Sequence, residues 1–374
     1  MKTAGKRAVS ILLALLLALG LAGSAAAADE SITGEIVIYS SMYPFVLDIL
    51  DEELKKEFPN LVPGNGDSFF IYGGSTSLTR TIYSDMKTGT LSCDMMLVAE
   101  PALALELKEA GYLEPVEVEN AASVLCFPYD EEGYWYPVRV CNMVLAYNPE
   151  LEEKWAAEGV KIPRSFQDFA FDRSLKGKIA MGDPLSSGTT FAALASLMQT
   201  DHYGRTYLKK LAANEVSIVS GSASLEGVQN GDYAAVMVLE ESVLKRLKDA
   251  EDAGEPLTNL KCIYPEDGVI LIPSPVMTVA EEHSKNRNPE ACKAVEKWFL
   301  NRDAQSIILR GYMHSVFADA AGIPYGSVST SELIGMDMKV KWENVYYGRE
   351  ELNNAWNSIV LNREEKTPGR NMSR

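Results

Sequence analysis

Alternation between short apolar strands and amphipathic helices is the feature that most constrains the fold of this chain. Residues 35–40 have the pattern of a buried strand, and residues 45–58 carry apolar side chains at helical spacing. The unit then recurs as a strand and a helix in turn at 69–72, 77–87, 93–98 and 101–110. Because parallel strands need a crossover element between them, this alternation predicts a mostly parallel α/β sheet flanked by helices.

Two extended segments are too long and too apolar to be ordinary edge strands. The first covers residues 134–148 and the second covers residues 268–273. We interpret both as crossings between two lobes, which makes one lobe discontinuous in sequence and creates a hinge. The length agrees, because single hydrophobic cores stop growing at about 250–300 residues. The predicted fold class is therefore α/β with two lobes, each a mixed sheet flanked by helices, joined by two hinge crossings.

The N-terminus has the pattern of an export signal. Lys2, Lys6 and Arg7 precede an apolar run at residues 11–21, and small residues follow at 24–28. The apolar run is too short to be an ordinary membrane-spanning helix. We expect cleavage near Ala27 or Ala28.

The expected location is the periplasm, with no lipid anchor, because Ser24 stands where a lipoprotein signal requires cysteine. Loss of residues 1–28 removes three positive charges and takes the formal net charge from −17 to −20. Such an acidic surface argues against nucleic acid and anionic membrane as partners. We expect a flexible tail at residues 362–374.

The cysteines and histidines do not have the spacing of a metal site. The five cysteines are an odd set, so at least one stays unpaired. Cys126 and Cys141 flank an acidic turn and either face each other across a hairpin or are buried free thiols. The cysteines are Cys93, Cys126, Cys141, Cys262 and Cys292. No catalytic or cofactor-binding motif is present, so we expect neither catalysis nor a cofactor.

A hydroxyl-rich turn at residues 183–190 leads directly into an apolar helical segment at 191–198. The first backbone N–H groups of a helix have no partner within the helix, so this turn is a candidate anion site. The alternative is that the hydroxyls only cap the helix. In parallel sheets ligands bind beyond the carboxyl ends of the strands, and four further hydroxyl residues lie there. They are Ser40, Ser41, Ser75 and Thr76.

The chain resembles a known family over nearly all of residues 35–315. The resemblance is carried, in order, by Tyr39-Ser40-Ser41, Gly74-Ser75-Thr76, Tyr147-Asn148-Pro149, Gly182-Asp183-Pro184, Ser187-Gly188-Thr189 and residues 264–268 before Ile272-Pro273-Ser274-Pro275. These segments resemble the type II periplasmic solute-binding proteins of ATP-driven (ABC) importers, particularly the ferric-ion-like and the sugar-phosphate or phosphonate-binding branch. The resemblance implies two lobes that close around a small solute and a membrane permease as partner, without bond chemistry.

One position bears on the branch within this family. Ferric-binding members use two adjacent tyrosines after the strand that is predicted here at residues 233–239, whereas this chain has Glu240 and Glu241. A cleft-facing Glu240 would accept hydrogen bonds from hydroxyls or pair with an ammonium group; the alternative is a solvated glutamate at a helix start. Arg139, on the first crossing, either binds phosphate or carboxylate in bidentate fashion or braces the hinge through a salt bridge.

We therefore predict a monomeric protein that binds a small anionic organic solute, phosphorylated or a phosphonate. The alternatives are a ferric-ion carrier and a ligand-binding sensor that docks a receptor. The predicted ligand-binding residues are Ser40, Ser41, Ser75, Thr76, Arg139, Ser187, Gly188, Thr189 and Glu240. The predicted segments are a signal peptide (1–28), lobe 1 (29–137 and 270–320), lobe 2 (138–269), a C-terminal helical region of uncertain lobe (321–361) and the tail (362–374).

Overall fold

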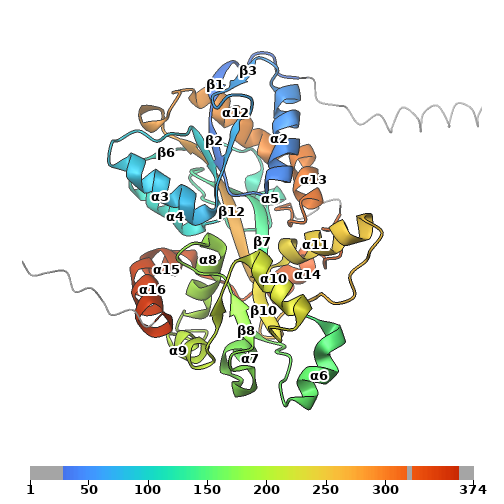
Figure 1. The fold of residues 1–374 in the computed structure, drawn as a ribbon. Helices are drawn as coiled ribbons and strands as arrows, with labels where there is room; N and C mark the ends of the chain where they lie inside the picture. The colour runs from blue at the N-terminus through green and yellow to red at the C-terminus, as the bar shows by residue number, and fades with distance from the viewer. Residues whose placement is uncertain (1–27, 318–321, 362–374) are drawn as a thin grey trace, which may run out of the picture.

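The computed structural model describes residues 28–317 and 322–361, which form two lobes joined by two long strands (Figure 1). The predicted signal peptide, apart from Ala28, and the predicted tail lie outside the described residues. In the part of the chain that the structure describes, no helix is long and apolar enough to cross a membrane.

Lobe 1 contains the first strand–helix units and the helices that follow the second crossing. Pro44, Pro101 and Pro289 each occupy the first turn of a helix, where the missing N–H costs nothing. Its elements are β1 (Gly34–Ile36), β2 (Ile38–Ser40), α2 (Pro44–Glu57), β3 (Leu61–Pro63), β4 (Phe70–Tyr72), α3 (Ser75–Met86), β5 (Met95–Leu97), α4 (Pro101–Glu109), β6 (Leu113–Glu114), α5 (Ala121–Val124), η3 (Glu281–His283), α12 (Pro289–Phe299) and α13 (Arg302–Arg310).

Lobe 2 contains the other end of the main sheet. Its elements are η1 (Pro149–Leu151), α6 (Glu152–Ala157), α7 (Phe166–Phe171), η2 (Arg173–Leu175), β8 (Ile179–Met181), α8 (Gly188–Leu197), α9 (Thr206–Ala213), β9 (Ser217–Ile218), α10 (Gly221–Asn230), β10 (Ala235–Leu239), α11 (Glu240–Asp252) and β11 (Lys261–Ile263). The C-terminal region adds α14 (Thr330–Met336), α15 (Trp342–Tyr347), α16 (Arg349–Ala355) and η4 (Trp356–Val360). Of these, α15, α16 and η4 pack on the core of lobe 2, whereas Leu333 of α14 belongs to the core cluster of lobe 1.

The two lobes share one continuous sheet because both crossing strands belong to it. Its order is β4-β2-β5-β12-β7-β10-β8-β9, with β6 paired to β12 and β11 paired to β7. The strands on each side, β2 with β4 and β5, and β8 with β9 and β10, are parallel. The predicted alternation of strands and helices is therefore confirmed.

The predicted strand at 35–40 is divided in two at Val37. The Val37 N–H donates to the Asp94 carboxylate at 2.7 Å rather than to a neighbouring strand. As a result β1 pairs with β3 in a separate two-stranded sheet, and only β2 joins the main sheet.

The crossings are β7 (Tyr136–Tyr147) and β12 (Ile270–Val279), which pair antiparallel and are buried along their whole length. The second crossing is longer than the predicted 268–273, because Pro273 and Pro275 do not end the strand. A register shift between Ser274 and Pro275 accommodates the missing N–H groups.

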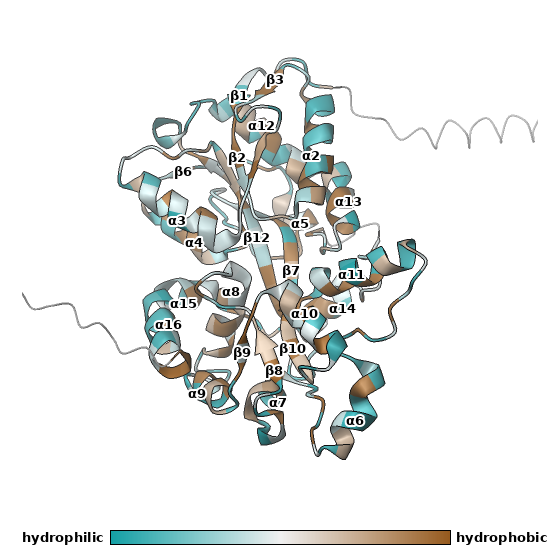
Figure 2. Ribbon diagram, viewed as in Figure 1, coloured by the Kyte–Doolittle hydropathy of each residue, from teal (hydrophilic) through white to brown (hydrophobic). Residues whose placement is uncertain are grey.

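Each lobe has its own hydrophobic core, and the outer helices turn hydrophilic faces to solvent (Figure 2). The core of lobe 1 includes Ile38, Leu50 and Phe299, whereas that of lobe 2 includes Phe166 and Leu197. The C-terminal Trp342 and Trp356 belong to the core of lobe 2. All five described cysteines are free, so Cys126 and Cys141 do not form the disulfide that we considered.

Candidate functional site

A cleft of about 1220 Å³ lies between the lobes. Tyr43 and Tyr72 line it from lobe 1, where they stand at the start of α2 and the end of β4. The rest of its wall comes from the ends of β8, β9 and β10 and from the helices that follow them. The cleft therefore lies at the carboxyl edge of the parallel strands, where ligands bind in sheets of this kind.

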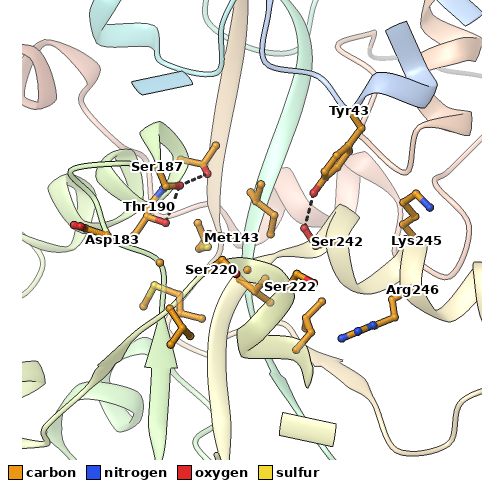
Figure 3. Close-up of a pocket in the computed structure, with 18 of the residues that line it drawn as sticks. Tyr43, Met143, Asp183, Ser187, Thr190, Ser220, Ser222, Ser242, Lys245 and Arg246 are labelled. Atoms are coloured by element: carbon orange, nitrogen blue, oxygen red, sulfur yellow. Dashed lines mark hydrogen bonds between the residues drawn. The ribbon is translucent and has the colours of Figure 1, made fainter. Parts of the chain in front are cut away.

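Three helices of lobe 2 begin at the wall of this cleft: α8, α10 and α11. Ser187 caps α8 by accepting a hydrogen bond from the Thr190 N–H at 3.2 Å, and Ser220 caps α10 by accepting one from the Ala223 N–H at 3.3 Å. The Ser187 hydroxyl also lies 3.0 Å from the Thr190 hydroxyl (Figure 3). The positive ends of the α8 and α10 dipoles therefore face the cleft, whereas the first turn of α11 carries the acids Glu240 and Glu241.

The 183–190 turn has both of the properties that we considered for it. Ser187 caps a helix, and Ser187, Thr189 and Thr190 also line the cleft. Asp183, at the start of the turn, accepts hydrogen bonds from the Leu185 N–H at 2.9 Å and from the Trp356 indole at 3.1 Å. These two hydrogen bonds fix the orientation of the Asp183 carboxylate.

Two cationic side chains on α11, Lys245 and Arg246, line the same cleft. Lys245 pairs with Asp249 at 2.5 Å. Arg246 forms no salt bridge with any other described residue, and its Nη1 is buried without a hydrogen-bond partner. Figure 3 shows the Arg246 side chain extending from α11 toward Ser222 at the start of α10. Neither residue was among our predictions, although both lie within two turns of the predicted strand end.

One hydrogen bond spans the cleft between the lobes. The Tyr43 hydroxyl lies 2.6 Å from the Ser242 hydroxyl on α11 (Figure 3). Burial and the nearby Glu241 raise the pKa of Tyr43 above its ordinary value, so this phenol is protonated at neutral pH.

Glu240 does not line the cleft. Its carboxylate lies 3.0 Å from both His314 Nε2 and Asn142 Nδ2, and it accepts hydrogen bonds from Tyr264 at 2.5 Å and from Ser327. Burial opposes its ionisation, but the hydrogen bonds from His314, Ser327 and Tyr264 outweigh burial and lower the pKa. A buried carboxylate needs such partners, which explains why it is not directed at the cleft.

Arg139 is also absent from the cleft wall and forms a buried ion pair. Its Nη1 lies 3.3 Å from Glu241 Oε1, and its Nη2 lies 3.4 Å from the Ser41 hydroxyl. Burial raises the pKa of Glu241, and the Arg139 charge opposes that rise. Of the two roles considered for Arg139, this contact corresponds to the salt bridge that braces the hinge.

The four predicted hydroxyl residues of lobe 1 lie outside the main cleft. The Ser40 hydroxyl accepts from the Met42 N–H at 3.2 Å, and the Ser41 hydroxyl accepts from the Ala99 N–H at 3.1 Å. Ser75 packs on Gly188, where an added Cβ would lie 2.6 Å from the Ser75 Cβ. Only glycine fits there, and the N-termini of α3 and α8 meet across the lobes.

Thr76 and Gly188 line a second, smaller cavity of about 280 Å³ between the lobes. Of the nine predicted residues, Ser187 and Thr189 line the main cleft. The roles of all nine in ligand binding stay predictions. The cleft residues outside the predicted set include Tyr43 and Tyr72, whose rings the sequence alone assigns to packing, and Ser220, Ser222, Ser242, Lys245 and Arg246.

Within residues 28–317 and 322–361, no group of three or more His, Cys, Asp or Glu side chains is placed to hold a metal ion. The adjacent Tyr346 and Tyr347 both donate to Glu109, each at 3.1 Å.

Solved structures with the same fold include several periplasmic binding proteins. The periplasmic binding protein P5PA is 21% identical, with a TM-score of 0.69 and coverage of 87% of this chain and 99% of that one. AfuA from Actinobacillus pleuropneumoniae, solved with exogenous fructose-6-phosphate bound, is 20% identical, with a TM-score of 0.69 and coverage of 88% and 99%. Iron-bound HitA from Pseudomonas aeruginosa is 18% identical, with a TM-score of 0.70 and coverage of 86% and 98%.

These likenesses agree with the two lobes joined by β7 and β12. No curated protein matches the sequence. A protein-family model described as bacterial extracellular solute-binding protein matches residues 91–329, which include both crossings and all of lobe 2 except its C-terminal helices. The chain therefore belongs to the bacterial extracellular solute-binding protein family.

Proposed function

We propose that this protein captures a small anionic organic solute, phosphorylated or a phosphonate, and delivers it to the membrane permease of an ABC transporter. The protein acts in the periplasm as a monomer and performs no bond chemistry. Closure of the two lobes about β7 and β12 retains the solute in the cleft.

The observation that carries this proposal is the balance of charge and donors in the cleft. The N-termini of α8 and α10, a row of hydroxyl groups and Arg246, which has no ion-pair partner among the described residues, all favour an anion. Of the two carboxylates of the wall, Asp249 is paired with Lys245, and Asp183 accepts hydrogen bonds from the neutral Trp356 indole and Leu185 N–H and keeps its charge. An anionic ligand therefore meets one carboxylate whose charge is not paired, together with the hydrogen-bond donors and Arg246.

The energies are sufficient for tight binding. A hydrogen bond to a charged group contributes roughly 1.5–3 kcal/mol, and micromolar affinity corresponds to about 8 kcal/mol. Several such hydrogen bonds, in addition to those that offset the entropic cost of binding, are enough for micromolar affinity. The apolar part of the wall, including Met143, Leu225 and Met237, suits the carbon skeleton of an organic solute.

A ferric ion is the alternative, because HitA has the same fold and was solved with iron bound. The resemblance implies that ferric-binding members hold iron with tyrosines, and the cleft tyrosine Tyr43 is instead a partly buried, protonated hydrogen-bonding partner of Ser242. Glu240 and Glu241 are committed to His314 and Arg139. These contacts favour the organic anion.

Native mass spectrometry of protein purified without refolding tests the proposal. We expect a co-purified phosphorylated or phosphonate compound, which should then raise the melting temperature of the apoprotein. Ligand at 100 times its dissociation constant stabilises by about 2.7 kcal/mol, which is readily measured. Fructose 6-phosphate, fructose, inorganic phosphate and ferric citrate form the comparison panel.

An organic-anion binder, an iron carrier and an enzyme would each respond differently to these compounds. A shift with phosphorylated compounds and none with fructose supports the proposal. A visible charge-transfer band on addition of ferric citrate, with no response to any organic anion, would replace it by iron carriage. A ligand converted to product during incubation would indicate an enzyme.

A further inference from the structure

The C-terminal segment at residues 341–360, which we call the C-terminal strap, is fixed to lobe 2 at the candidate site. Trp342, Leu352 and Trp356 are buried in the core of that lobe. Trp356 donates to Asp183, the first residue of the 183–190 turn, at 3.1 Å. The Gln199 side chain, just after α8, donates to the Lys341 carbonyl at 3.1 Å. The strap is therefore held to both ends of the turn–helix unit that lines the cleft.

The same strap also contacts lobe 1. Tyr346 and Tyr347 on α15 donate to the two carboxylate oxygens of Glu109 on α4, each at 3.1 Å. Arg349, at the start of α16, pairs through Nη1 with the carboxylate of Glu100, the residue that precedes α4. The strap thus adds side-chain contacts between the lobes to the Tyr43–Ser242 hydrogen bond and to the hydrogen bond from Arg80 to the Leu185 carbonyl.

The Arg349–Glu100 pair differs from the other strap contacts because it is largely shielded from solvent. The side chains are 22% and 4% exposed, and the second Glu100 oxygen accepts from the Thr79 hydroxyl of α3 at 3.0 Å. The Arg349 guanidinium also lies over the Phe191 ring of α8, 5.1 Å from its centroid. Arg349 therefore lies between the first turns of the cleft helix α8 and a buried acid of lobe 1.

We propose that Arg349 is a positioning residue for lobe closure, and that the strap couples occupancy of the 183–190 turn to that closure. Separation of the lobes would break the Arg349–Glu100 pair while Trp356 and Phe191 keep the strap on lobe 2. An anion that orders the turn also orders the strap that reaches lobe 1. The ligand part of this inference rests on the proposed function, whereas the closure part does not.

Small-angle X-ray scattering of the ligand-free protein tests the closure part. The variants are Arg349→Gln, Glu100→Gln, Arg349→Lys and the charge exchange Arg349→Glu with Glu100→Arg. We expect Arg349→Gln and Glu100→Gln each to raise the radius of gyration, Arg349→Lys to raise it less, and the charge exchange to restore part of the loss. The control is Arg205→Gln, since Arg205 pairs with Glu351 on α16 within lobe 2 and both side chains are exposed.

Titration with fructose 6-phosphate tests the coupling. If loss of the pair reduces the closed population tenfold, the apparent dissociation constant rises roughly tenfold. We expect this rise for Arg349→Gln and Glu100→Gln and no change for Arg205→Gln. Hydrogen exchange at α4 should increase in the same two variants. A merely structural role for Arg349 would lower stability without the partial rescue by the charge exchange.

The scattering and hydrogen-exchange measurements test the strap inference, and the binding measurements test the proposed function. Unchanged radius of gyration and unchanged exchange at α4 in both folded single variants would overturn the strap inference. If Arg349→Gln does not fold, Glu100→Gln decides in its place. Absence of binding by the unmodified protein to every phosphorylated probe contradicts the proposed function, while the scattering measurements still decide whether the strap controls closure.

Discussion

The lobes meet on two sides, the strap side and the cleft side, which differ in whether their positive charges have acid partners. On the strap side, Arg349 pairs through Nη1 with Glu100, although its Nε and Nη2 are buried without hydrogen-bond partners, and the tyrosines of α15 donate to Glu109. On the cleft side, the N-termini of α8 and α10 have no acid in their first turns, and Arg246 has no ion-pair partner among the described residues. Because positive charge that lacks an acid partner next to a cavity favours an anionic ligand, whereas an ion pair stabilises a contact, we interpret the cleft side as a binding surface and the strap side as a bracing one.

The largest expected effect concerns the strap side. Trp356→Ala removes a fully buried side chain from the core of lobe 2 and should cost about 3–5 kcal/mol of the free energy of unfolding. Trp356→Phe keeps most of the packing but loses the bond to Asp183, so it should cost less. Denaturant titration measures both. Equal losses in the two variants would show that the hydrogen bond, not the packing, fixes the strap.

A second prediction places the pH dependence of stability inside lobe 1, away from both sides of the lobe contact. Burial raises the pKa of Glu296 to about 8, against an ordinary value of 4.5, while a hydrogen bond from Thr278 opposes the rise. Between these values the folded state binds more protons than the unfolded state, so the free energy of unfolding falls as pH rises from about 4.5 to 8.

Glu296→Gln should remove this part of the pH dependence, which is on the order of a few kcal/mol. Melting temperatures at pH 5 and pH 8 measure it, and affinity for fructose 6-phosphate at one pH should not change. A pH dependence identical to that of the unmodified protein would contradict the assignment.

On the cleft side, Arg246→Gln should weaken binding of whichever phosphorylated compound of the panel raises the melting temperature of the unmodified protein. Loss of a hydrogen bond to a charged group costs roughly 1.5–3 kcal/mol, or about 10- to 100-fold in affinity. Because Arg246 has no ion-pair partner among the described residues, thermal stability should stay nearly constant. Lys245→Gln is the matched control, since Lys245 is already paired with Asp249. Equal affinity losses in both variants would contradict a special role for Arg246.

The smallest effect is expected for Thr189→Val, which preserves the shape of the side chain but removes its hydroxyl. The Thr189 hydroxyl lies 3.3 Å from that of Ser187 at the cleft wall. Its loss should weaken binding of the same phosphorylated compound by about 1 kcal/mol, roughly fivefold. Thr81→Val, on the exposed face of α3 in lobe 1, should leave the affinity unchanged. Isothermal titration calorimetry measures both, and an unchanged affinity for Thr189→Val would remove this hydroxyl from the site.

Much of the fold could be predicted because it depends on local periodicity. The predicted helix at 45–58 corresponds to α2 (Pro44–Glu57), and the predicted crossing at 134–148 contains β7 (Tyr136–Tyr147). The strands β6 and β9 span two residues each, too few for a periodic pattern. The continuation of β12 beyond Pro273 was missed because prolines ordinarily end a strand, and only its pairing with β7 reveals the register shift.

The site was predictable only in part. The 183–190 turn was found because hydroxyl residues before an apolar helix form a local signal, and the structure places it on the cleft. Ser220, Ser222 and Arg246 follow strands or lie within a helix without any distinctive local pattern. The direction of the Glu240 carboxylate was not predictable either, because its partner His314 is 74 residues away in sequence.

By itself, the sequence determined the alternating α/β units, the two crossings and the hydroxyl-rich helix start, since all three depend on neighbouring residues along the chain. Only the tertiary structure decided which polar groups are paired with each other and which face the cleft. Arg139 on β7 and Arg246 on α11 are both arginines, yet packing places Arg139 against Glu241, whereas Arg246 has no acid partner among the described residues. The physical reason is that the charge state and availability of a side chain depend on its neighbours in space, which the order of residues does not specify.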